Sequence, residues 1–169
     1  MRAEERRQAI AKRLQNARQP VSAAALAAEF SVSRQIIVGD VALLRAGGAD
    51  ISATPRGYVV LKPGKGLTCR VACRHDAGGM EAELNAMVDN GCTVADVIVE
   101  HPIYGQLTGP LQLSSRYEVR QFLERTARYG AQPLSMLTEG IHLHTLLCPD
   151  QAACDRVYRA LGELGVLVK

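Results

Sequence analysis

The feature that most limits how this chain can fold is the stretch of residues 62–66, which reads KPGKG. Proline and glycine alternate there with lysine, so neither helical nor strand periodicity can continue through the stretch. The chain has 169 residues, which is long enough for one large domain or two small ones, each able to bury a core. We therefore expect a boundary at this stretch, with one domain over residues 1–61 and a second over residues 66–169.

Charge differs between the two predicted domains. Residues 1–61 carry nine Arg and Lys against five Asp and Glu, whereas residues 62–169 carry eleven against twelve. A small basic module joined to a nearly neutral one is typical of a DNA-binding domain attached to a sensing domain.

The cellular compartment follows from two further features of the sequence. The chain contains neither an apolar run of about eighteen residues nor an apolar N-terminal signal segment. Its five cysteines stand at irregular spacing, which suits reduced thiols. We expect a cytoplasmic protein with no membrane partner.

The first domain shows helical periodicity in three segments, each with a recognisable end. Ser22 and Ser33 are suitable N-cap residues for the second and third helices. The predicted elements are helices over residues 3–17, 23–30 and 34–46, and a β-hairpin over residues 51–61 in the place of a wing. This order predicts a winged helix-turn-helix domain, whose third helix enters the major groove of DNA.

The N-terminal residues of such a third helix face the base edges. Ser33, Arg34 and Gln35 are therefore the predicted readers, because Ser can contact phosphate, Arg pairs with guanine and Gln pairs with adenine. Arg56, at the tip of the hairpin, is expected to contact phosphate or the minor groove. Gly39 is unusual inside this helix and costs about 1 kcal/mol relative to Ala. The alternative is a three-helix structural module with no nucleic-acid partner.

The second domain alternates between strand and helix periodicity. Strands are predicted over residues 67–75, 94–100, 107–113 and 138–146. Helices are predicted over residues 80–90, after Ser115, and over residues 151–164. The order strand, helix, strand, strand, helix, strand, with one more helix, is that of a split βαβ or ferredoxin-like domain. The whole chain is thus predicted to be a mixed α/β protein of the α+β kind, whose first and last body strands lie side by side.

Two of the four histidines, His142 and His144, are two residues apart on the last predicted strand and share one face. Two neutral imidazoles at this spacing can hold one divalent cation, and imidazole suits zinc, nickel, copper or iron. His75, at the end of the first body strand, meets this pair if the two strands are neighbours. Glu81 and Glu83 border the apolar stripe of the next helix on opposite sides, and the pattern does not choose between them. The alternative is a strand with two polar side chains turned to water.

Four strings in this sequence carry a resemblance to a known family. They are residues 33–38 (SRQIIV), 54–58 (TPRGY), 99–105 (VEHPIYG) and 137–145 (LTEGIHLHT). Taken together, they resemble the niacin-responsive transcriptional repressors of the NiaR type, which join a helix-turn-helix domain to a three-histidine domain. The match runs nearly end to end.

The resemblance implies a set of metal ligands and an effector. It implies that His75, Glu83, His142 and His144 hold a divalent transition metal, nickel or zinc, and so favours Glu83 over Glu81. It implies nicotinic acid as the co-repressor. We expect His101, Tyr104 and Gly105 to contact this effector, and a structural role for His101 in its turn is an equal alternative.

The resemblance also implies a homodimer that binds operator DNA and represses niacin-uptake or NAD-biosynthesis genes, and it adds Arg45 and Tyr58 to the DNA contacts. A direct metal sensor is the alternative function. A metalloenzyme with Glu100 near the metal is a third possibility, and we expect no enzyme activity. Gly39 departs from the family pattern, and so do Cys69 and Cys73. The spacing of these two cysteines is too weak a pattern to indicate a zinc site. Cys73 is expected to be a neighbour of the metal.

Overall fold

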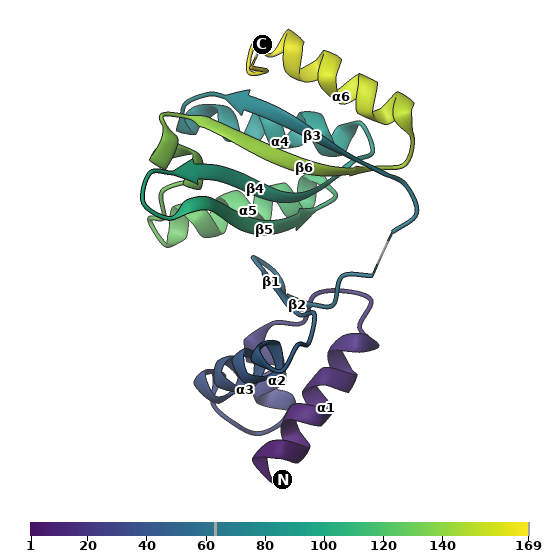
Figure 1. The fold of residues 1–169 in the computed structure, drawn as a ribbon, viewed down its shortest axis with the longest axis vertical. Coiled ribbons are helices and arrows are strands. Elements are labelled where there is room, and N and C mark those ends of the chain that lie inside the picture. The colour runs from purple at the N-terminus through teal and green to yellow at the C-terminus, as the bar shows by residue number, and fades with distance from the viewer. Residues whose placement is uncertain (63, 169) are drawn as a thin grey trace. The chain divides into compact units, whose positions relative to one another are not determined.

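The computed structural model describes residues 1–62 and 64–168, so Pro63 in the predicted linker and Lys169 lie outside the described residues. The chain divides into two compact units, residues 1–63 and 64–169, and each is described by itself (Figure 1). Among the described residues, no helix has the length and apolar character needed to cross a membrane.

The first unit contains three helices and a short hairpin, as the sequence predicts. The elements are α1 (Ala3–Gln15), α2 (Ala23–Glu29), α3 (Arg34–Ala46), β1 (Ser52–Thr54) and β2 (Gly57–Val59). The first two helices end slightly earlier than expected, because Asn16 and Phe30 serve as their C-caps. Seven buried apolar residues form the core: Ile10, Leu14, Val21, Leu26, Ile37, Val41 and Ile51.

The predicted N-caps are present in the first unit. The hydroxyl of Ser22 accepts a hydrogen bond from the N–H of Ala25, and that of Ser33 accepts one from the N–H of Ile36.

Helices α1 and α3 are joined by a side-chain pair that the sequence did not reveal. Asp40 is buried on the inner face of α3, and its Oδ2 accepts a hydrogen bond from Nε of Arg6 at 2.6 Å.

The second unit contains four strands and three α-helices. The elements are β3 (Leu67–Arg74), α4 (Met80–Asp89), β4 (Thr93–His101), β5 (Gly105–Leu113), α5 (Arg116–Arg128), β6 (Ile141–Cys148) and α6 (Gln151–Glu163), with 3-10 turns η1 (Ala77–Gly79) and η2 (Leu134–Thr138). The predicted order is confirmed. The turn η2 was missed and expected to be a loop, because one 3-10 turn is too short to show periodicity.

The four strands form one antiparallel sheet in the order β3-β6-β4-β5. Because every neighbouring pair is antiparallel, β3 runs parallel to β4 with β6 between them, and β5 runs parallel to β6 with β4 between them. Both βαβ units are therefore split, as predicted. The expected contact between the first and last body strands is also confirmed, with Cys73 opposite His142 and Val71 opposite His144.

The three α-helices of this unit share one hydrophobic core with one face of the sheet (Figure 1). On β6, the side chains facing this core alternate with partly exposed ones, so that His142, His144, Leu146 and Cys148 all point inward. The alternative interpretation, in which both histidines are turned to water, is therefore wrong. The burial gives both histidines an environment that requires partners for their ring nitrogens.

Candidate metal centre and nucleic-acid interface

Three imidazoles converge on one carboxylate at the end of the sheet where β6 begins. The Nε2 atom of His142 lies 2.7 Å from Oε1 of Glu83, and Nε2 of His75 lies 2.6 Å from its Oε2. Nε2 of His144 is 3.2 Å from Oε1 of Glu83, but its geometry is not that of a hydrogen bond. These four residues form the His/Glu cluster, and the structure brings all four together as the sequence analysis expected.

The opposite ring nitrogens of the three histidines are held by backbone carbonyls. Nδ1 of His142 donates to the carbonyl oxygen of Gly140 at 2.8 Å, and Nδ1 of His144 donates to that of Asp96 at 2.7 Å. Nδ1 of His75 makes the same contact with the carbonyl oxygen of Asp76. A neutral imidazole that donates from Nδ1 presents a lone pair at Nε2. Neutral rings held in this way would turn three lone pairs toward Glu83, whereas protonated rings would donate hydrogen bonds to it.

Three lone pairs facing a carboxylate repel one another unless a positive charge lies among them. The side chains of His75 and Glu83 are only 6% and 1% exposed, so water does not screen that repulsion. Nε2 of His144 is buried and has no hydrogen-bond partner among the described residues. A divalent cation would satisfy all three nitrogens at once, and three imidazoles with one carboxylate are a donor set that zinc and nickel accept. The residues present thus fit a metal ion.

The alternative source of positive charge is protonation of the imidazoles. The hydrogen bond with Glu83 raises the pKa of His75, against the opposing effect of burial. Burial would raise the pKa of Glu83, but its hydrogen bonds with His142 and His75 and the nearby ring of His144 outweigh that effect and hold the pKa far below the usual value. Glu83 is therefore an anion that binds either protons on histidine or a cation.

Two glycines, Gly79 and Gly140, allow their backbone segments to pack closely against His75. A Cβ at Gly79 would lie 2.8 Å from Cβ and Cγ of His75, and a Cβ at Gly140 would collide with the carbonyl oxygen of His75. Gly140 also has a φ of +91°, which side chains rarely adopt. Any other residue at these two positions would displace His75 from the cluster.

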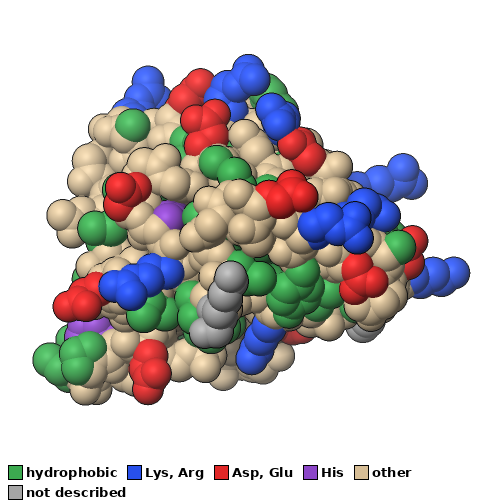
Figure 2. Space-filling view, turned by 90° about the horizontal axis from the view of Figure 1, so that it is seen from above, with side chains coloured by type: hydrophobic (Ala, Val, Ile, Leu, Met, Phe, Trp, Pro, Cys, Tyr) green, Lys and Arg blue, Asp and Glu red, His purple; other side chains and the backbone are tan. Residues whose placement is uncertain are grey.

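Cys73 is a direct neighbour of Glu83, as expected. Burial raises the pKa of its thiol, and the nearby negative charge of Glu83 raises it further. The thiol therefore stays protonated beside the carboxylate. The side chains of His75, His142 and His144 are covered from solvent, and little histidine surface shows in the view of Figure 2.

The exposed N-terminus of α3 carries the predicted DNA readers. Ser33, Arg34 and Gln35 are exposed, while Ile37 and Val41 on the opposite face are buried in the core of the first unit. Arg45 is exposed near the C-terminal end of the same helix. The arrangement leaves polar side chains of α3 available to a groove of DNA.

The hairpin residues predicted to contact DNA have partners inside the first unit. A guanidinium nitrogen of Arg56 donates to Oε1 of Gln19 at 3.0 Å. Tyr58 packs against the core, and its backbone pairs with that of Val21. Both side chains are half-buried, so part of each surface remains available.

Comparison with known proteins assigns both units. Residues 6–59 match the model of an HTH domain and residues 68–169 match that of the 3H domain. The chain is 42% identical over 166 residues to the "Probable transcription repressor NiaR" of Thermotoga maritima, covering 98% of this chain and 95% of that protein. It is 41% identical over 160 residues to the "Transcription repressor NadR" of Bacillus subtilis, covering 92% and 89%.

The chain belongs to the NiaR and NadR family of transcription repressors. It is accordingly a DNA-binding repressor and not an enzyme, and the metalloenzyme interpretation is wrong. The three-helix module with no nucleic-acid partner is excluded by the same relatives.

The predicted effector residues of this repressor lie on the turn between β4 and β5. Nδ1 of His101 accepts hydrogen bonds from the backbone N–H groups of Ile103 and Tyr104, at 3.1 and 3.2 Å, so His101 has a structural part in the turn. Tyr104 is 74% exposed, and its ring centroid lies 5.1 Å from that of His101. Gly105 follows with a φ of +69°.

This turn lies at the same end of the sheet as the His/Glu cluster. Ile98 on β4 pairs with Leu143 on β6, and Arg74 on β3 pairs with Ile141. Because β4 and β6 are antiparallel, the residues after Ile98 approach the end where β6 begins. A role for the turn in binding an effector stays a prediction.

Several residues that shape the cluster were missed. The carbonyls of Asp76, Asp96 and Gly140 fix the three rings, and Oδ1 of Asp96 also accepts a hydrogen bond from the N–H of Thr145 at 2.9 Å. A backbone acceptor has no side-chain identity, so sequence alone gives no signal for it. The signal that was available is Gly140 directly before the histidine strand.

Proposed function

We propose that this repressor controls niacin-uptake or NAD-biosynthesis genes, with nicotinic acid as co-repressor bound at a metal ion of the His/Glu cluster. The observation that carries the proposal is the convergence of three Nε2 atoms on the carboxylate of Glu83. The names of two relatives, NiaR and NadR, with which the chain aligns over nearly its whole length, support the same repressor function.

The ligands of the ion would be His75, Glu83, His142 and His144, and nickel or zinc suits this donor set. When bound, the ion supplies open coordination positions that accept the carboxylate or ring nitrogen of nicotinate. The carbonyls of Asp76, Gly140 and Asp96 keep the imidazoles in the tautomer that can coordinate. On the neighbouring turn, His101 and Tyr104 would contact the effector by hydrogen bond and stacking.

The response to nicotinate requires two conformations with different affinity for the effector. In the proposed homodimer, nicotinate favours the geometry that spaces the two α3 helices by one turn of DNA. Ser33, Arg34, Gln35 and Arg45 on α3, with Arg56 and Tyr58 of the hairpin, would then contact the operator.

A titration of operator DNA tests this function. A duplex is first selected from a random library with protein, nickel or zinc, and nicotinate, and its affinity is then measured by gel shift with and without nicotinate. Nicotinate in the presence of metal is expected to raise affinity, and nicotinamide is the matched control ligand. If nicotinate changes nothing, the co-repressor proposal is wrong.

A direct metal sensor is the second candidate, because the cluster alone accounts for a metal response. In that case metal alone would raise operator affinity to its full extent and nicotinate would add nothing. The same titration, run with metal and no nicotinate, separates the two functions.

A further inference from the structure

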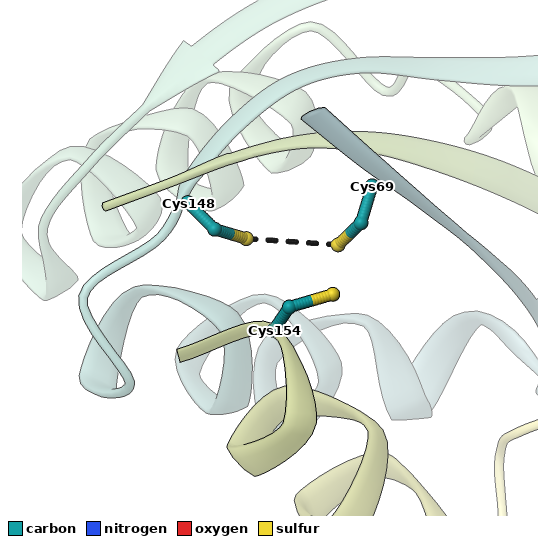
Figure 3. Close-up of side chains that lie close together, drawn as sticks. All are labelled: Cys69, Cys148 and Cys154. Atoms are coloured by element: carbon teal, nitrogen blue, oxygen red, sulfur yellow. Dashed lines mark hydrogen bonds between the residues drawn. The ribbon is translucent and has the colours of Figure 1, made fainter. Parts of the chain in front are cut away.

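A second group of ligand-type side chains lies in the body, apart from the His/Glu cluster. Sγ of Cys148 is 3.6 Å from Sγ of Cys69 and 2.8 Å from Sγ of Cys92. The sulfur atoms of Cys69, Cys148 and Cys154 all lie within 4.8 Å of one another (Figure 3). These four residues form the thiol cluster, which contains four of the five cysteines of the chain.

The thiol cluster joins four separate segments of the fold. Cys69 comes from β3, Cys148 from the end of β6, Cys154 from the first turn of α6, and Cys92 from the turn after α4. It lies on the same face of β6 as the histidines but at the other end of the strand, with the buried Leu146 between His144 and Cys148. The two clusters therefore share no ligand.

The grouping of the sulfur atoms, and one separation in particular, suit a metal–thiolate site. Single buried cysteines are usually small apolar core residues, but that explanation does not account for three sulfurs from three elements within 4.8 Å of one another. A zinc ion with Zn–S bonds of about 2.3 Å places its sulfur ligands about 3.8 Å apart. The separation of Cys69 and Cys148, 3.6 Å, is close to this value.

The helix dipole and an entry path favour an ion at this cluster. Cys154 lies in the first turn of α6, where the helix dipole favours a thiolate. Burial raises the pKa of Cys92 and Arg156 acts weakly in the opposite direction, whereas at Cys154 burial raises the pKa and the charge of Asp155 adds to that effect. Cys69 is only half-buried, so an ion can reach the cluster from solvent beside it.

We propose that the thiol cluster binds one thiophilic metal ion, Cu⁺ or Zn²⁺, through the sulfur atoms of Cys69, Cys148 and Cys154. Each coordinating thiol loses its proton to solvent as its sulfur binds the ion. Cys92 donates a hydrogen bond to the sulfur of Cys148 in the three-sulfur site that suits Cu⁺. It becomes the fourth ligand where Zn²⁺ completes a tetrahedron, after its sulfur moves from 2.8 Å to about 3.8 Å from that of Cys148.

A disulfide between Cys92 and Cys148 is the competing chemistry. Burial raises the pKa of Cys148 to about 12 and that of Cys154 to about 11. Little thiolate is therefore present at neutral pH to attack an oxidant or a disulfide. A bound cation compensates the cost of a buried thiolate directly and competes with protons for the sulfur atoms, so its affinity is expected to rise with pH.

The test uses the reduced full-length protein without nicotinate or DNA. Two equivalents of Zn²⁺ are added, so that the His/Glu cluster cannot account for all the metal, and X-ray absorption at the zinc edge is recorded. The proposal predicts a shell of sulfur atoms at about 2.3 Å in addition to nitrogen and oxygen atoms. A parallel titration with Cu⁺ is expected to give a sulfur-to-copper charge-transfer absorption.

Variants then assign the sulfur ligands. Cys154→Ser and Cys69→Ser should lose most of the sulfur shell and of the copper absorption, whereas Cys73→Ser, which removes the one cysteine outside the cluster, should keep both. Cys92→Ser separates the two ions, because it should weaken the zinc site and leave the copper site intact. The wild-type absorption spectrum does not depend on whether any variant folds.

Two results would overturn the proposal. One is a zinc shell of nitrogen and oxygen atoms alone, together with no copper absorption. The other is the isolation of protein whose mass and peptide map show a Cys92–Cys148 disulfide and whose reduced form binds neither ion. Neither result bears on operator binding, so the repressor function is tested separately.

Discussion

Glu83 and His142 are 59 residues apart in the chain, yet Oε1 of Glu83 lies 2.7 Å from Nε2 of His142. Helix α4 brings the carboxylate, and β6 brings the imidazole, to a point covered from solvent. A buried carboxylate that receives three imidazoles is the structural reason to regard this end of the sheet as a metal site.

Replacing Glu83 by glutamine should weaken metal binding most. The amide keeps the size of the side chain but removes the negative charge, so the loss should exceed the roughly 10- to 100-fold cost of losing an outer-shell partner. Glu81→Gln removes the same charge from an exposed position on α4 and is the matched control. Calorimetric titration with nickel or zinc measures both. Equal affinities for the two variants would contradict the assignment of Glu83.

Gly79→Ala tests whether close packing positions His75. The new Cβ would lie 2.8 Å from Cβ and Cγ of His75, so the ring must shift, and we expect metal affinity to fall about 10- to 100-fold. Gly162→Ala in α6 meets no atom within 4 Å and is the control. Metal affinity measured by competition with a chelating dye should separate the two variants, and unchanged affinity in Gly79→Ala would mean that His75 is not held by this contact.

The metal-free protein should have an acidic optimum of stability. The hydrogen bond to Glu83 raises the pKa of His75 despite burial. The contribution of His75 to the free energy of unfolding is therefore complete below about pH 6.5 and is lost as pH rises through its folded-state pKa. Despite burial, hydrogen bonds from the histidines hold the pKa of Glu83 far below its usual value, so its contribution is complete above about pH 4.5 and is lost only in strong acid. The window in which both contributions act is about pH 4.5 to 6.5.

Thermal unfolding of chelator-treated protein checks this expectation. The Tm should fall between about pH 6 and pH 8, and the increase in Tm on adding metal should grow over the same interval, because protons compete with the ion for Nε2. Glu83→Gln, which lacks the carboxylate, is expected to lose the acidic optimum. A metal-free wild-type protein with a flat Tm from pH 6 to pH 8 would contradict the description of the cluster.

Arg34→Ala and Gln35→Ala should weaken binding to the selected operator and relax its sequence preference. Each bidentate contact with a base is worth about 1–3 kcal/mol of discrimination. Lys12→Ala removes one positive charge from an exposed position on α1 and is the control, expected to alter at most the salt dependence. Gel shifts on the operator and on a scrambled duplex measure both effects. If all three variants behave alike, α3 is not the reading helix.

Local patterns predicted those parts of the fold and the cluster that depend on neighbouring residues. The caps Ser22 and Ser33 placed two helices of the first unit, and strand periodicity placed His142 and His144 on one face. The order of elements also implied that β3 and β6 are neighbours, which brings His75 to the pair. These inferences need only the periods of helices and strands and the usual topology of a split βαβ domain.

Local sequence patterns could not predict the features that depend on tertiary packing. The helical wheel left Glu81 and Glu83 equivalent, because only the rotation of α4 on the sheet buries one of them. Arg6 and Asp40, which join two helices, are 34 residues apart in the chain, and no spacing rule pairs them. The thiol cluster was missed for the same reason, since Cys92, Cys148 and Cys154 come from separate elements.

Anomalous diffraction at the metal edge, from crystals of the full chain grown with nickel and nicotinate, is the most direct test of the metal site. We expect an anomalous peak within about 2.0–2.2 Å of the Nε2 atoms of His75, His142 and His144 and of a Glu83 oxygen, with nicotinate density on its open side. Nickel-soaked crystals without a peak at this position, and with the three imidazoles hydrogen-bonded to Glu83 as protonated rings, would contradict it.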